Sequence, residues 1–415
     1  MRPFSNSDTA TIAPARSATH PGKQNLAMSH ATPRKNGHSA ADRRPTVCHV
    51  IHALGVGGAE VLVDIMARRL ADQYRCVIAV LDEVGPIGEQ LRADGFVVEH
   101  LNRQPGIDRG CARRLDAFAG RHHAGLLHAH QYTPFFQSML SRGLFGSRPV
   151  LLTEHGRHFP DLPSWKRSLV NRLLLRRNDR LVGVGESVRQ ALIVNEGLPA
   201  GRVEVVYNGV DLDSLAAPSA DARERLRREF GLTDNHFVIL QVARLHELKD
   251  HQTALIAVDE ARRTVPEIRL LLAGDGPERS AIQQTIAERG LEQHVILTGT
   301  RSDIADLLAA ADVFLLSSIS EGIPLTIIEA MAAGLPVVST AVGGIPEMIE
   351  HRRSGFLAAA GDSLGLAASL IGLHQAPDLR RSIGQEGRRQ AESRFSLEVM
   401  LAGYSRLYQE MLHVH

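Results

Sequence analysis

The feature that most constrains the fold is the regular alternation of short apolar runs with helical segments, which occurs in two successive series. The first series contains apolar runs at 47–54, 76–81, 96–101, 125–128, 150–153, 181–184 and 203–207. The second contains runs at 237–242, 268–273, 295–298, 313–316 and 337–340. Strands that alternate with helices are typical of parallel sheets with helices on both faces. The sequence therefore predicts an α/β protein with two doubly wound, Rossmann-like domains.

The two series are separated by a break between Asp211 and Asn235, where a Pro- and Ala-containing stretch precedes a charged helical piece. A chain of 415 residues also exceeds what one hydrophobic core usually organises. In doubly wound sheets ligands bind outside the carboxyl ends of the strands, so a central cleft between facing domains is the expected site. The predicted divisions are a tail (1–45), a first domain (46–212), a linker (213–235), a second domain (236–395) and a terminal segment (396–415).

Charge and composition exclude several classes of protein. Residues 1–45 hold seven Lys or Arg against two acids and no apolar run, which predicts a disordered basic tail rather than a secretory signal. A net charge of +1 does not favour a nucleic-acid binder. The three cysteines are far apart, so neither a disulfide framework nor a cysteine metal site is expected. No apolar run approaches the roughly 18 residues of a membrane span, and a cytoplasmic protein is expected.

The strongest candidate site is the segment from Glu321 to Glu329. Two Glu eight positions apart occur about once by chance in such a chain, and Glu196 and Glu204 form such a pair. The setting is more informative, because a predicted strand leads through a polar loop and a Gly-Ile-Pro turn into a helix that begins near Leu325.

Amides of that turn and the positive end of the helix dipole suit a diphosphate. Glu329 would then be placed for ribose hydroxyls and Glu321 for hydroxyls of a transferred sugar. The alternative is that Glu321 caps the helix and Glu329 lies on its solvated face.

Arg244 and Lys249 follow the predicted strand 237–242, on the side expected to face the cleft. Two cations beside a diphosphate can neutralise the charge that develops as it leaves. The alternative is an ordinary pair of exposed loop residues.

Two segments of the first domain are weaker candidates. Gly57 and Gly58 belong to a glycine-rich loop, but Glu60 replaces the third glycine of a dinucleotide fingerprint, which argues against an oxidoreductase. His155 follows the strand 150–153 and could contact sugar or phosphate, although a histidine satisfied within a loop is more common.

A basic helix is predicted at 165–180, with six Lys or Arg and one acid. It could lie on anionic lipid on the inner face of the membrane. A solvated basic face over a packed apolar face is the alternative.

In their order along the chain, these segments resemble the retaining glycosyltransferase family 4, whose members have the GT-B fold. The resemblance runs from Val47 to the C-terminus and is carried by Glu321–Ala330, Ala243–Leu245 with Lys249, Asn208–Asp211 and Gly274–Pro277. The segment Glu154–Arg157 with Asp161 and Trp165-Lys166 also resembles exopolysaccharide-type sugar transferases of this family, which often use lipid-linked acceptors.

The resemblance implies a role for each matching residue. Arg244 and Lys249 would bind the donor diphosphate, Glu329 the ribose and Glu321 the donor sugar. The remaining implied donor-side residues are the first-domain Gly57, Gly58 and His155 and the turn residues Gly322, Ile323, Pro324 and Leu325.

The resemblance also implies a retaining reaction of the hexosyltransferase type, and a last helix, 396–412, that crosses back to the first domain. A front-face mechanism, in which the leaving phosphate helps to deprotonate the acceptor, is favoured over Glu321 as a covalent nucleophile. No metal or other cofactor is implied, and Asp211-Leu-Asp213 is interpreted as part of a turn rather than a metal site.

The predicted function is transfer of a sugar from a UDP-, GDP- or ADP-sugar to a hydroxyl of a glycan, a lipid-linked glycan or a small molecule. Two alternatives remain. A sugar-nucleotide epimerase of similar architecture would process the donor without an acceptor, and a non-catalytic nucleotide-binding module would consume no donor. No nucleic acid partner is expected.

Overall fold

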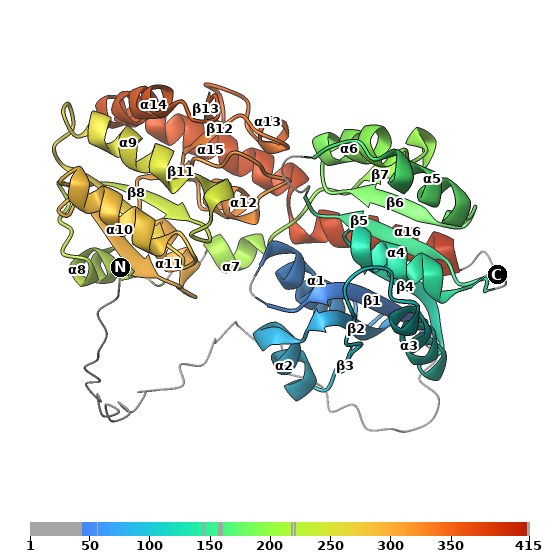
Figure 1. Cartoon of the computed structure of the whole chain (residues 1–415). Helices are drawn as coiled ribbons and strands as arrows, with labels where there is room; N and C mark the ends of the chain where they lie inside the picture. The colour runs from blue at the N-terminus through green and yellow to red at the C-terminus, as the bar shows by residue number, and fades with distance from the viewer. Residues whose placement is uncertain are drawn as a thin grey trace, which may run out of the picture. The chain divides into compact units, whose positions relative to one another are not determined.

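The computed structural model describes residues 44–412, except residues 56, 144–145, 157–160, 217–218 and 220. These residues form two parallel β-sheets flanked by helices, as the sequence predicted (Figure 1). The predicted basic tail lies outside the described residues as far as residue 43.

The first sheet has seven strands in the order β3-β2-β1-β4-β5-β6-β7, and every pairing in it is parallel. The chain enters at a central strand, builds toward one edge and returns to build the other, which is the doubly wound pattern. The strands are β1 (Thr46–Ala53), β2 (Arg75–Glu83), β3 (Val97–His100), β4 (Ala124–His130), β5 (Val150–Glu154), β6 (Arg180–Gly183) and β7 (Val203–Val205).

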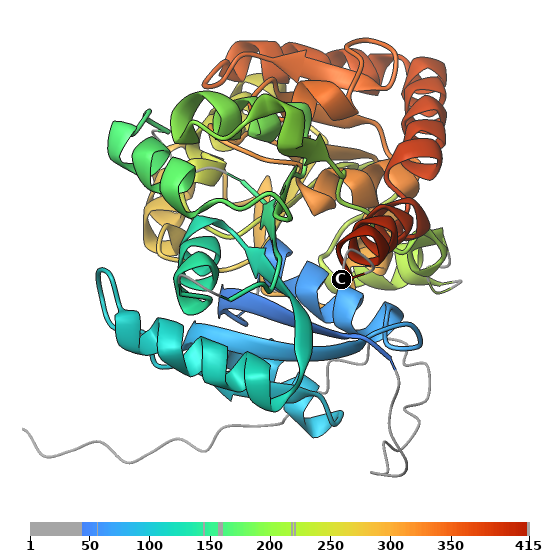
Figure 2. The ribbon, with the colours of Figure 1, turned by 90° about the vertical axis from the view of Figure 1, so that its right-hand side faces the viewer.

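Helices cover both faces of this sheet (Figure 2). One face packs against α1 (Gly58–Arg69), α2 (Gly85–Ala93) and α16 (Leu397–Leu412). The other packs against α3 (Arg109–Arg121), α4 (Tyr132–Ser141) and α6 (Glu186–Glu196). The helix α5 (Trp165–Leu174) lies beside α6, and the short η1 (Ala200–Arg202) precedes β7.

The second sheet has six parallel strands in the order β10-β9-β8-β11-β12-β13. Its strands are β8 (Phe237–Val242), β9 (Ile268–Ala273), β10 (Val295–Gly299), β11 (Val313–Leu316), β12 (Val337–Thr340) and β13 (Gly355–Ala358). The sequence analysis did not include β13, a four-residue edge strand of which only Gly355 is fully buried.

One face of the second sheet is covered by α9 (His251–Ala261), α10 (Arg279–Glu288) and α14 (Ser363–Gln375). The other face is covered by a larger group, which comprises α7 (Leu212–Ala216), α8 (Ala222–Glu229), α11 (Ile304–Ala310), α12 (Leu325–Ala332), α13 (Ile345–Met348) and α15 (Pro377–Arg394). The short η2 (Glu247–Lys249) directly precedes α9. The charged piece assigned to a linker, 222–229, thus packs on the core of the second sheet through Leu226.

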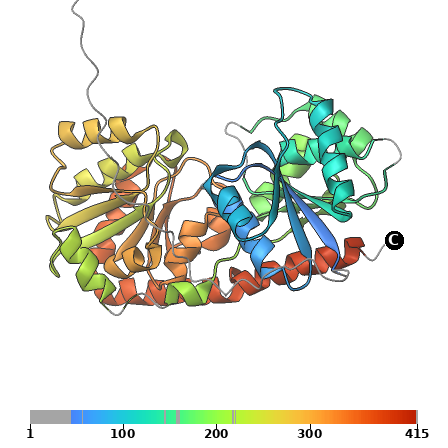
Figure 3. The same cartoon turned by 90° about the horizontal axis from the view of Figure 1, so that it is seen from below.

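The last helix, α16, follows α15 along the chain and lies against the first sheet (Figure 3). Its buried side chains Met400, Tyr404, Leu407 and Tyr408 belong to the same apolar cluster as β1 and α1. The last described helix therefore completes the core of the domain that contains β1.

The basic helix is shorter than predicted, since α5 ends at Leu174. The reason is Asp179, whose carboxylate accepts hydrogen bonds from the backbone N–H of Arg176 at 2.7 Å and of Val150 at 3.0 Å. It also pairs with the buried Arg142 at 2.5 Å, which ties this segment to the start of β5 and β6. Among the described residues, no helix has both the length and the apolar character needed to span a membrane.

Candidate functional site

Lys249 and Glu321 form the centre of the candidate site. The ammonium of Lys249 donates to Oε1 of Glu321 at 2.6 Å, and the Ser318 hydroxyl donates to the same oxygen at 2.6 Å. Lys249 follows β8 and Glu321 follows β11, and these two strands are neighbours in the sheet. Side chains predicted separately to bind diphosphate and sugar are therefore brought into direct contact.

The pair is partly shielded from solvent, with 27% of the Lys249 side chain and 8% of the Glu321 side chain exposed. The second carboxylate oxygen, Oε2 of Glu321, makes no hydrogen bond with any described residue. It remains available to a ligand hydroxyl.

Backbone contacts fix the position of Lys249. The Ser317 hydroxyl lies 3.0 Å from the carbonyl oxygen of Lys249 and 2.8 Å from that of Asp250. The N–H of Ile319 donates to the carbonyl of Leu248 at 2.9 Å. The loop after β11 and the loop after β8 therefore hold each other in place.

Arg244 lies on the same loop but has a free side chain. This side chain is exposed and makes no hydrogen bond or ion pair with the described part of the chain. Its backbone is fixed by the Gly274–Pro277 turn, because the N–H of Leu245 donates to the carbonyl of Asp275 at 3.0 Å. A Cβ atom at Gly274 would overlap the carbonyl oxygen of Ala243, so this turn requires glycine for close packing.

The Gly-Ile-Pro turn is held by close backbone contacts. A Cβ atom at Gly322 would overlap the carbonyl oxygen of His155, and the Gly322 carbonyl accepts from the N–H of Gly344 at 3.1 Å. Gly343 has φ +53°, and a Cβ atom there would overlap the carbonyl oxygen of Glu321. Sequence reasoning missed Gly343 and Gly344, although a Gly-Gly pair separated by two residues from the predicted strand 337–340 was the available signal.

The helix α12 begins without a side-chain cap. Its N-cap residue is Pro324, so the expectation that Glu321 might cap this helix is wrong. The Asn208 side chain donates to the carbonyl of Ile323 at 2.9 Å and anchors the turn. The end of α12 that carries Leu325 thus presents amides without a competing carboxylate.

Glu329 lies on α12 and is half-buried rather than fully solvated. Removal of water from its carboxyl group raises the pKa of Glu329 from its usual value near 4.5 to about 7. The carboxyl group therefore changes charge near neutral pH.

The glycine-rich loop of the first domain also reaches the second domain. Gly57 is the N-cap residue of α1, and the carboxylate of Glu60 folds back against it. Burial raises the pKa of Glu60 above its usual value. A Cβ atom at Gly58 would lie 3.9 Å from Cδ1 of Leu325, so two separately predicted donor-binding residues are neighbours.

His155 lies at the end of β5, with its carbonyl oxygen against Gly322. Its Nε2 lies 2.9 Å from Nδ1 of His130. Burial lowers the pKa of His155 to about 4, so the imidazole is neutral at pH 7.

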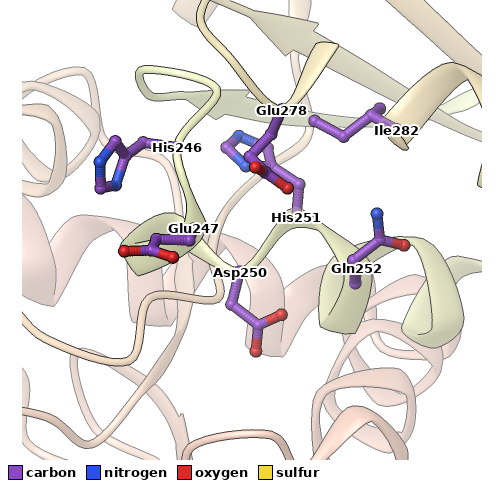
Figure 4. Close-up of a pocket in the computed structure, with 7 residues that line it drawn as sticks. All are labelled: His246, Glu247, Asp250, His251, Gln252, Glu278 and Ile282. Atoms are coloured by element: carbon purple, nitrogen blue, oxygen red, sulfur yellow. The ribbon is translucent and has the colours of Figure 1, made fainter. Parts of the chain in front are cut away.

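A small pocket of about 160 Å³ lies on the second domain (Figure 4). It is lined by His246, Glu247, Asp250, His251 and Gln252, together with Glu278 and Ile282. Three carboxylates, those of Glu247, Asp250 and Glu278, make this pocket unsuitable for a diphosphate. The exposed guanidinium of Arg244 and the Lys249–Glu321 pair are not part of its lining.

Comparison with known proteins places this geometry in a family. A family model described as Glycosyltransferase Family 4 matches residues 56–214, and one described as Glycosyl transferases group 1 matches residues 222–390. The N-acetyl-alpha-D-glucosaminyl L-malate synthase of Bacillus anthracis is 30% identical over 316 residues, which cover 74% of this chain and 80% of that protein. The putative glycosyltransferase EpsF of Bacillus subtilis is 32% identical over 311 residues, which cover 70% and 78% of the two chains.

Solved structures share the fold. A glycosyltransferase from Rickettsia africae superposes with a TM-score of 0.80 at 22% identity, over 90% of this chain and 100% of that chain. HepE of Anabaena, crystallised in complex with UDP, superposes with a TM-score of 0.78 at 24% identity, over 88% and 99% of the two chains.

The chain belongs to the family 4 glycosyltransferases. Its two parallel-sheet domains form the GT-B fold. The predictions of family, fold and sugar-transfer function are thereby confirmed, whereas the roles of individual site residues stay predictions.

The basic segment of this glycosyltransferase exposes apolar side chains as well as charges. Trp165, Leu169 and Leu173 of α5 are 73%, 50% and 74% exposed, whereas Leu174 packs against the core of the first domain. Asp211, in the Asp-x-Asp stretch, forms an ion pair with Arg69 of α1. That contact agrees with the interpretation of this stretch as structural.

Gly343→Ala tests whether close packing holds Glu321 in place. The substitution should lower the free energy of unfolding by about 2–3 kcal/mol, because it combines a strained φ with an overlap on the Glu321 carbonyl. Sugar transfer should fall with it, since the displaced backbone carries Glu321. Chemical denaturation and an assay of sugar transfer measure the two effects.

Gly334→Ala is the matched control, since Gly334 has φ +75° but no neighbour within 4 Å of an added Cβ. It should cost only about 1 kcal/mol and leave the specific activity intact. Equal losses of activity in the two variants would contradict a positional role for Gly343.

Proposed function

We propose that this glycosyltransferase takes its sugar from a nucleoside-diphosphate sugar and transfers it, with retention of anomeric configuration, to a hydroxyl of a glycan or lipid-linked acceptor. The observation that carries the proposal is the contact of Lys249 with Glu321, with the exposed Arg244 on the same loop as Lys249. A cation for phosphate and a carboxylate for sugar hydroxyls thus occupy one end of the second sheet.

The diphosphate would bind between Arg244, Lys249 and the beginning of α12. The Arg244 side chain has no partner among the described residues, so its guanidinium can form a fork with two phosphate oxygens. The uncapped amides of α12 add a positive field. HepE of Anabaena, a structural neighbour, was crystallised with UDP and with UDP-glucose, which supports a nucleotide donor in this fold.

The two glutamates would divide the rest of the donor. Oε2 of Glu321 is free to accept from a sugar hydroxyl while Oε1 holds Lys249 and Ser318. Glu329, once ionised, can accept from the two hydroxyls of a ribose. His155, beside Gly322, would face the sugar from the first domain.

Retention would follow a front-face mechanism rather than a double displacement. The leaving phosphate, held by Arg244 and Lys249, would help to deprotonate the acceptor hydroxyl on the same face of the sugar. Glu321 supports this assignment because its carboxylate is engaged by Lys249, which weakens it as a nucleophile. The two cations balance the diphosphate charge, so we propose a reaction that needs no metal ion.

Polysaccharide assembly is the context that the relatives favour. EpsD and EpsF of Bacillus subtilis are called putative glycosyltransferases, and AmsK of Erwinia amylovora is called an amylovoran biosynthesis glycosyltransferase. A growing, lipid-linked glycan is therefore the acceptor class we propose.

The helix α5 would bring the enzyme to such an acceptor. Trp165, Leu169 and Leu173 are spaced four residues apart and therefore share one face of the helix. The exposed Lys166 and Arg172 flank them. An apolar stripe bordered by cations is typical of a helix that lies in an anionic membrane interface.

Arg244→Ala gives the cleanest test of the donor site, because this exposed, unpaired side chain contributes little to stability. With UDP-, GDP- and ADP-sugars and a glycan acceptor, kcat/KM should fall by about 100-fold or more in Arg244→Ala and in Lys249→Ala. Arg263→Ala, at an exposed site of the same domain, should leave the rate unchanged. EDTA should have no effect, and the product anomer is read by NMR.

Three results would count against the proposal. Turnover without any acceptor and release of an epimerised sugar nucleotide would favour an epimerase. Nucleotide binding without turnover would favour a binding module. An inverted product would remove the front-face mechanism.

Glu329→Gln should change stability and donor binding in opposite directions. The folded state raises the pKa of Glu329, so its proton stabilises the fold at low pH and this contribution is lost as the pH rises through about 7. At pH 8 the free energy of unfolding of Glu329→Gln should exceed that of the unmodified enzyme by up to about 3 kcal/mol. At pH 5 the two values should differ little.

Donor affinity should nevertheless fall in Glu329→Gln at pH 8, because a carboxylate acceptor is lost. In the unmodified enzyme affinity should weaken by about tenfold between pH 8 and pH 6, and this dependence should disappear in the variant. Calorimetry and thermal unfolding measure both effects. Glu224→Gln, at an exposed position on α8, is the control, and parallel pH profiles for all three proteins would contradict the assignment.

Replacing Trp165, Leu169 and Leu173 together with Ser tests the membrane contact. Flotation with phosphatidylglycerol-rich vesicles should weaken at least about tenfold, because three apolar side chains no longer enter the interface. Leu364→Ser, at a residue that is 66% exposed on α14, should not change flotation. Equal flotation of all variants would exclude α5 as the contact.

A further inference from the structure

Three adjacent strands of the first sheet each contribute histidine to one face of the sheet. Side chains two apart on a strand share a face, and the partners of Val47 and Ile51 on this face are α1 and α16. His49 on β1, His130 on β4 and His155 after β5 all follow this alternation. We call these three residues the histidine row.

The imidazoles of the row are joined nitrogen to nitrogen. Nδ1 of His49 lies 3.0 Å from Nε2 of His130, and Nδ1 of His130 lies 2.9 Å from Nε2 of His155. Successive rings are stacked, with centroids 5.3 and 5.2 Å apart. The row therefore runs from the buried interior of the first domain to His155, whose backbone contacts Gly322.

Every member of the row is neutral at pH 7. Burial lowers the pKa of His49 and of His155 to about 4, and it lowers the pKa of His130 well below the usual range. A neutral imidazole has one N–H donor and one bare acceptor nitrogen. The two hydrogen bonds must therefore point in the same direction along the row, and only two arrangements are possible.

The two ends of the row decide between these arrangements. Nε2 of His49 and Nδ1 of His155 are both buried atoms without a hydrogen-bond partner in the described structure. A buried orphan N–H is rarer in proteins than a buried orphan acceptor. His49 is fully buried, whereas His155 is partly exposed and lies against Gly322 of the proposed donor site, so the unpaired N–H belongs at His155.

We propose that His130 and His49 are positioning residues that hold His155 as the tautomer protonated at Nδ1, so that it donates a hydrogen bond to an oxygen of the bound nucleotide sugar. The role of His155 toward the donor rests on the function proposed above. In this arrangement His49 Nδ1–H donates to His130 Nε2, and His130 Nδ1–H donates to His155 Nε2. Each proton stays on its own nitrogen, and no charge moves.

His128 provides an internal comparison. Its ring centroid lies 4.2 Å from that of His130, and it is equally buried. Its nitrogens nevertheless bond elsewhere, Nδ1 to the hydroxyl of Tyr408 at 2.6 Å and Nε2 to the hydroxyl of Thr153 at 2.8 Å. Loss of His128 therefore disturbs packing near the row without breaking its hydrogen bonds.

The first experiment reads the tautomer directly in the full-length enzyme without ligand. In protein labelled with ¹⁵N-histidine, long-range proton–nitrogen spectra distinguish a protonated Nδ1 from a protonated Nε2, and His155→Gln assigns the signal. We expect His155 to carry its proton on Nδ1. A proton on Nε2 would overturn the proposal whatever the activity, and this measurement stays readable even if no nucleotide sugar is turned over.

The second experiment compares His130→Phe with His128→Phe. His130→Phe should leave His155 as a mixture of tautomers and lower kcat/KM for the donor by about tenfold, because the donor hydrogen bond is no longer preset. His128→Phe should keep a single tautomer at His155 and change kcat/KM by less than about threefold. Equal losses of kcat/KM in the two variants, with the tautomer of His155 unchanged, would show that the row contributes only to packing.

Two further arms complete the test. If the His155 proton signal shifts with UDP alone, the oxygen that accepts from His155 belongs to a phosphate. If it shifts only with the intact sugar nucleotide, that oxygen belongs to the sugar.

His49, His128 and His130 are also close enough together to hold a metal ion. Stoichiometric binding of added Zn²⁺ that removes the His49 and His130 hydrogen bonds would overturn the proposal.

Discussion

The ion pair between Lys249 and Glu321 is the interaction on which the site depends. Removing both charges from water is costly, and the pair is tolerated because Ser318 adds a second hydrogen bond and because solvent still reaches Lys249. In the proposed reaction the Lys249 ammonium keeps one N–H on Oε1 of Glu321 and directs its other donors to the arriving diphosphate. The pair therefore holds the Glu321 carboxylate in place while Oε2 accepts from a sugar hydroxyl.

Backbone packing, more than side-chain packing, holds the pair in register. Gly343 fits only without a Cβ against the carbonyl of Glu321, and Gly274 only without one against the carbonyl of Ala243. Such contacts transmit small displacements directly, because no side chain lies between the two backbones to absorb them. The glycines that a sequence motif treats as turn residues therefore act as spacers that set the distance between neighbouring loops.

The sequence was sufficient for the parts of this picture that are local. Alternation of apolar runs with helical segments predicted both sheets, and the Gly-Ile-Pro turn before a helix marked the loop of Glu321. Strand order is not encoded in such patterns, and it decides that the loops after β8 and β11 lie side by side. The Lys249–Glu321 contact was unpredictable for that reason. His128 and His130 lie two residues apart on β4 and therefore share a face, but their partners on β1 and β5 follow only from the order of the strands.

A second consequence of topology concerns the Gly-Ile-Pro turn, which receives contacts from elements far along the chain. Asn208, after β7, binds the carbonyl of Ile323, and the carboxylate of Glu347 accepts from the N–H groups of Glu186 and Ser187 at 2.6 and 2.7 Å. Glu347 thereby caps α6, a helix whose own N-cap residue, Gly185, offers no side chain. Gly185 in turn packs on Ile323, so the cap and the turn share a neighbour. Asn208 and Gly185 of the first domain thus both contact Ile323, in the turn that would bind the donor diphosphate. A change in the packing between the two domains would therefore also displace this turn.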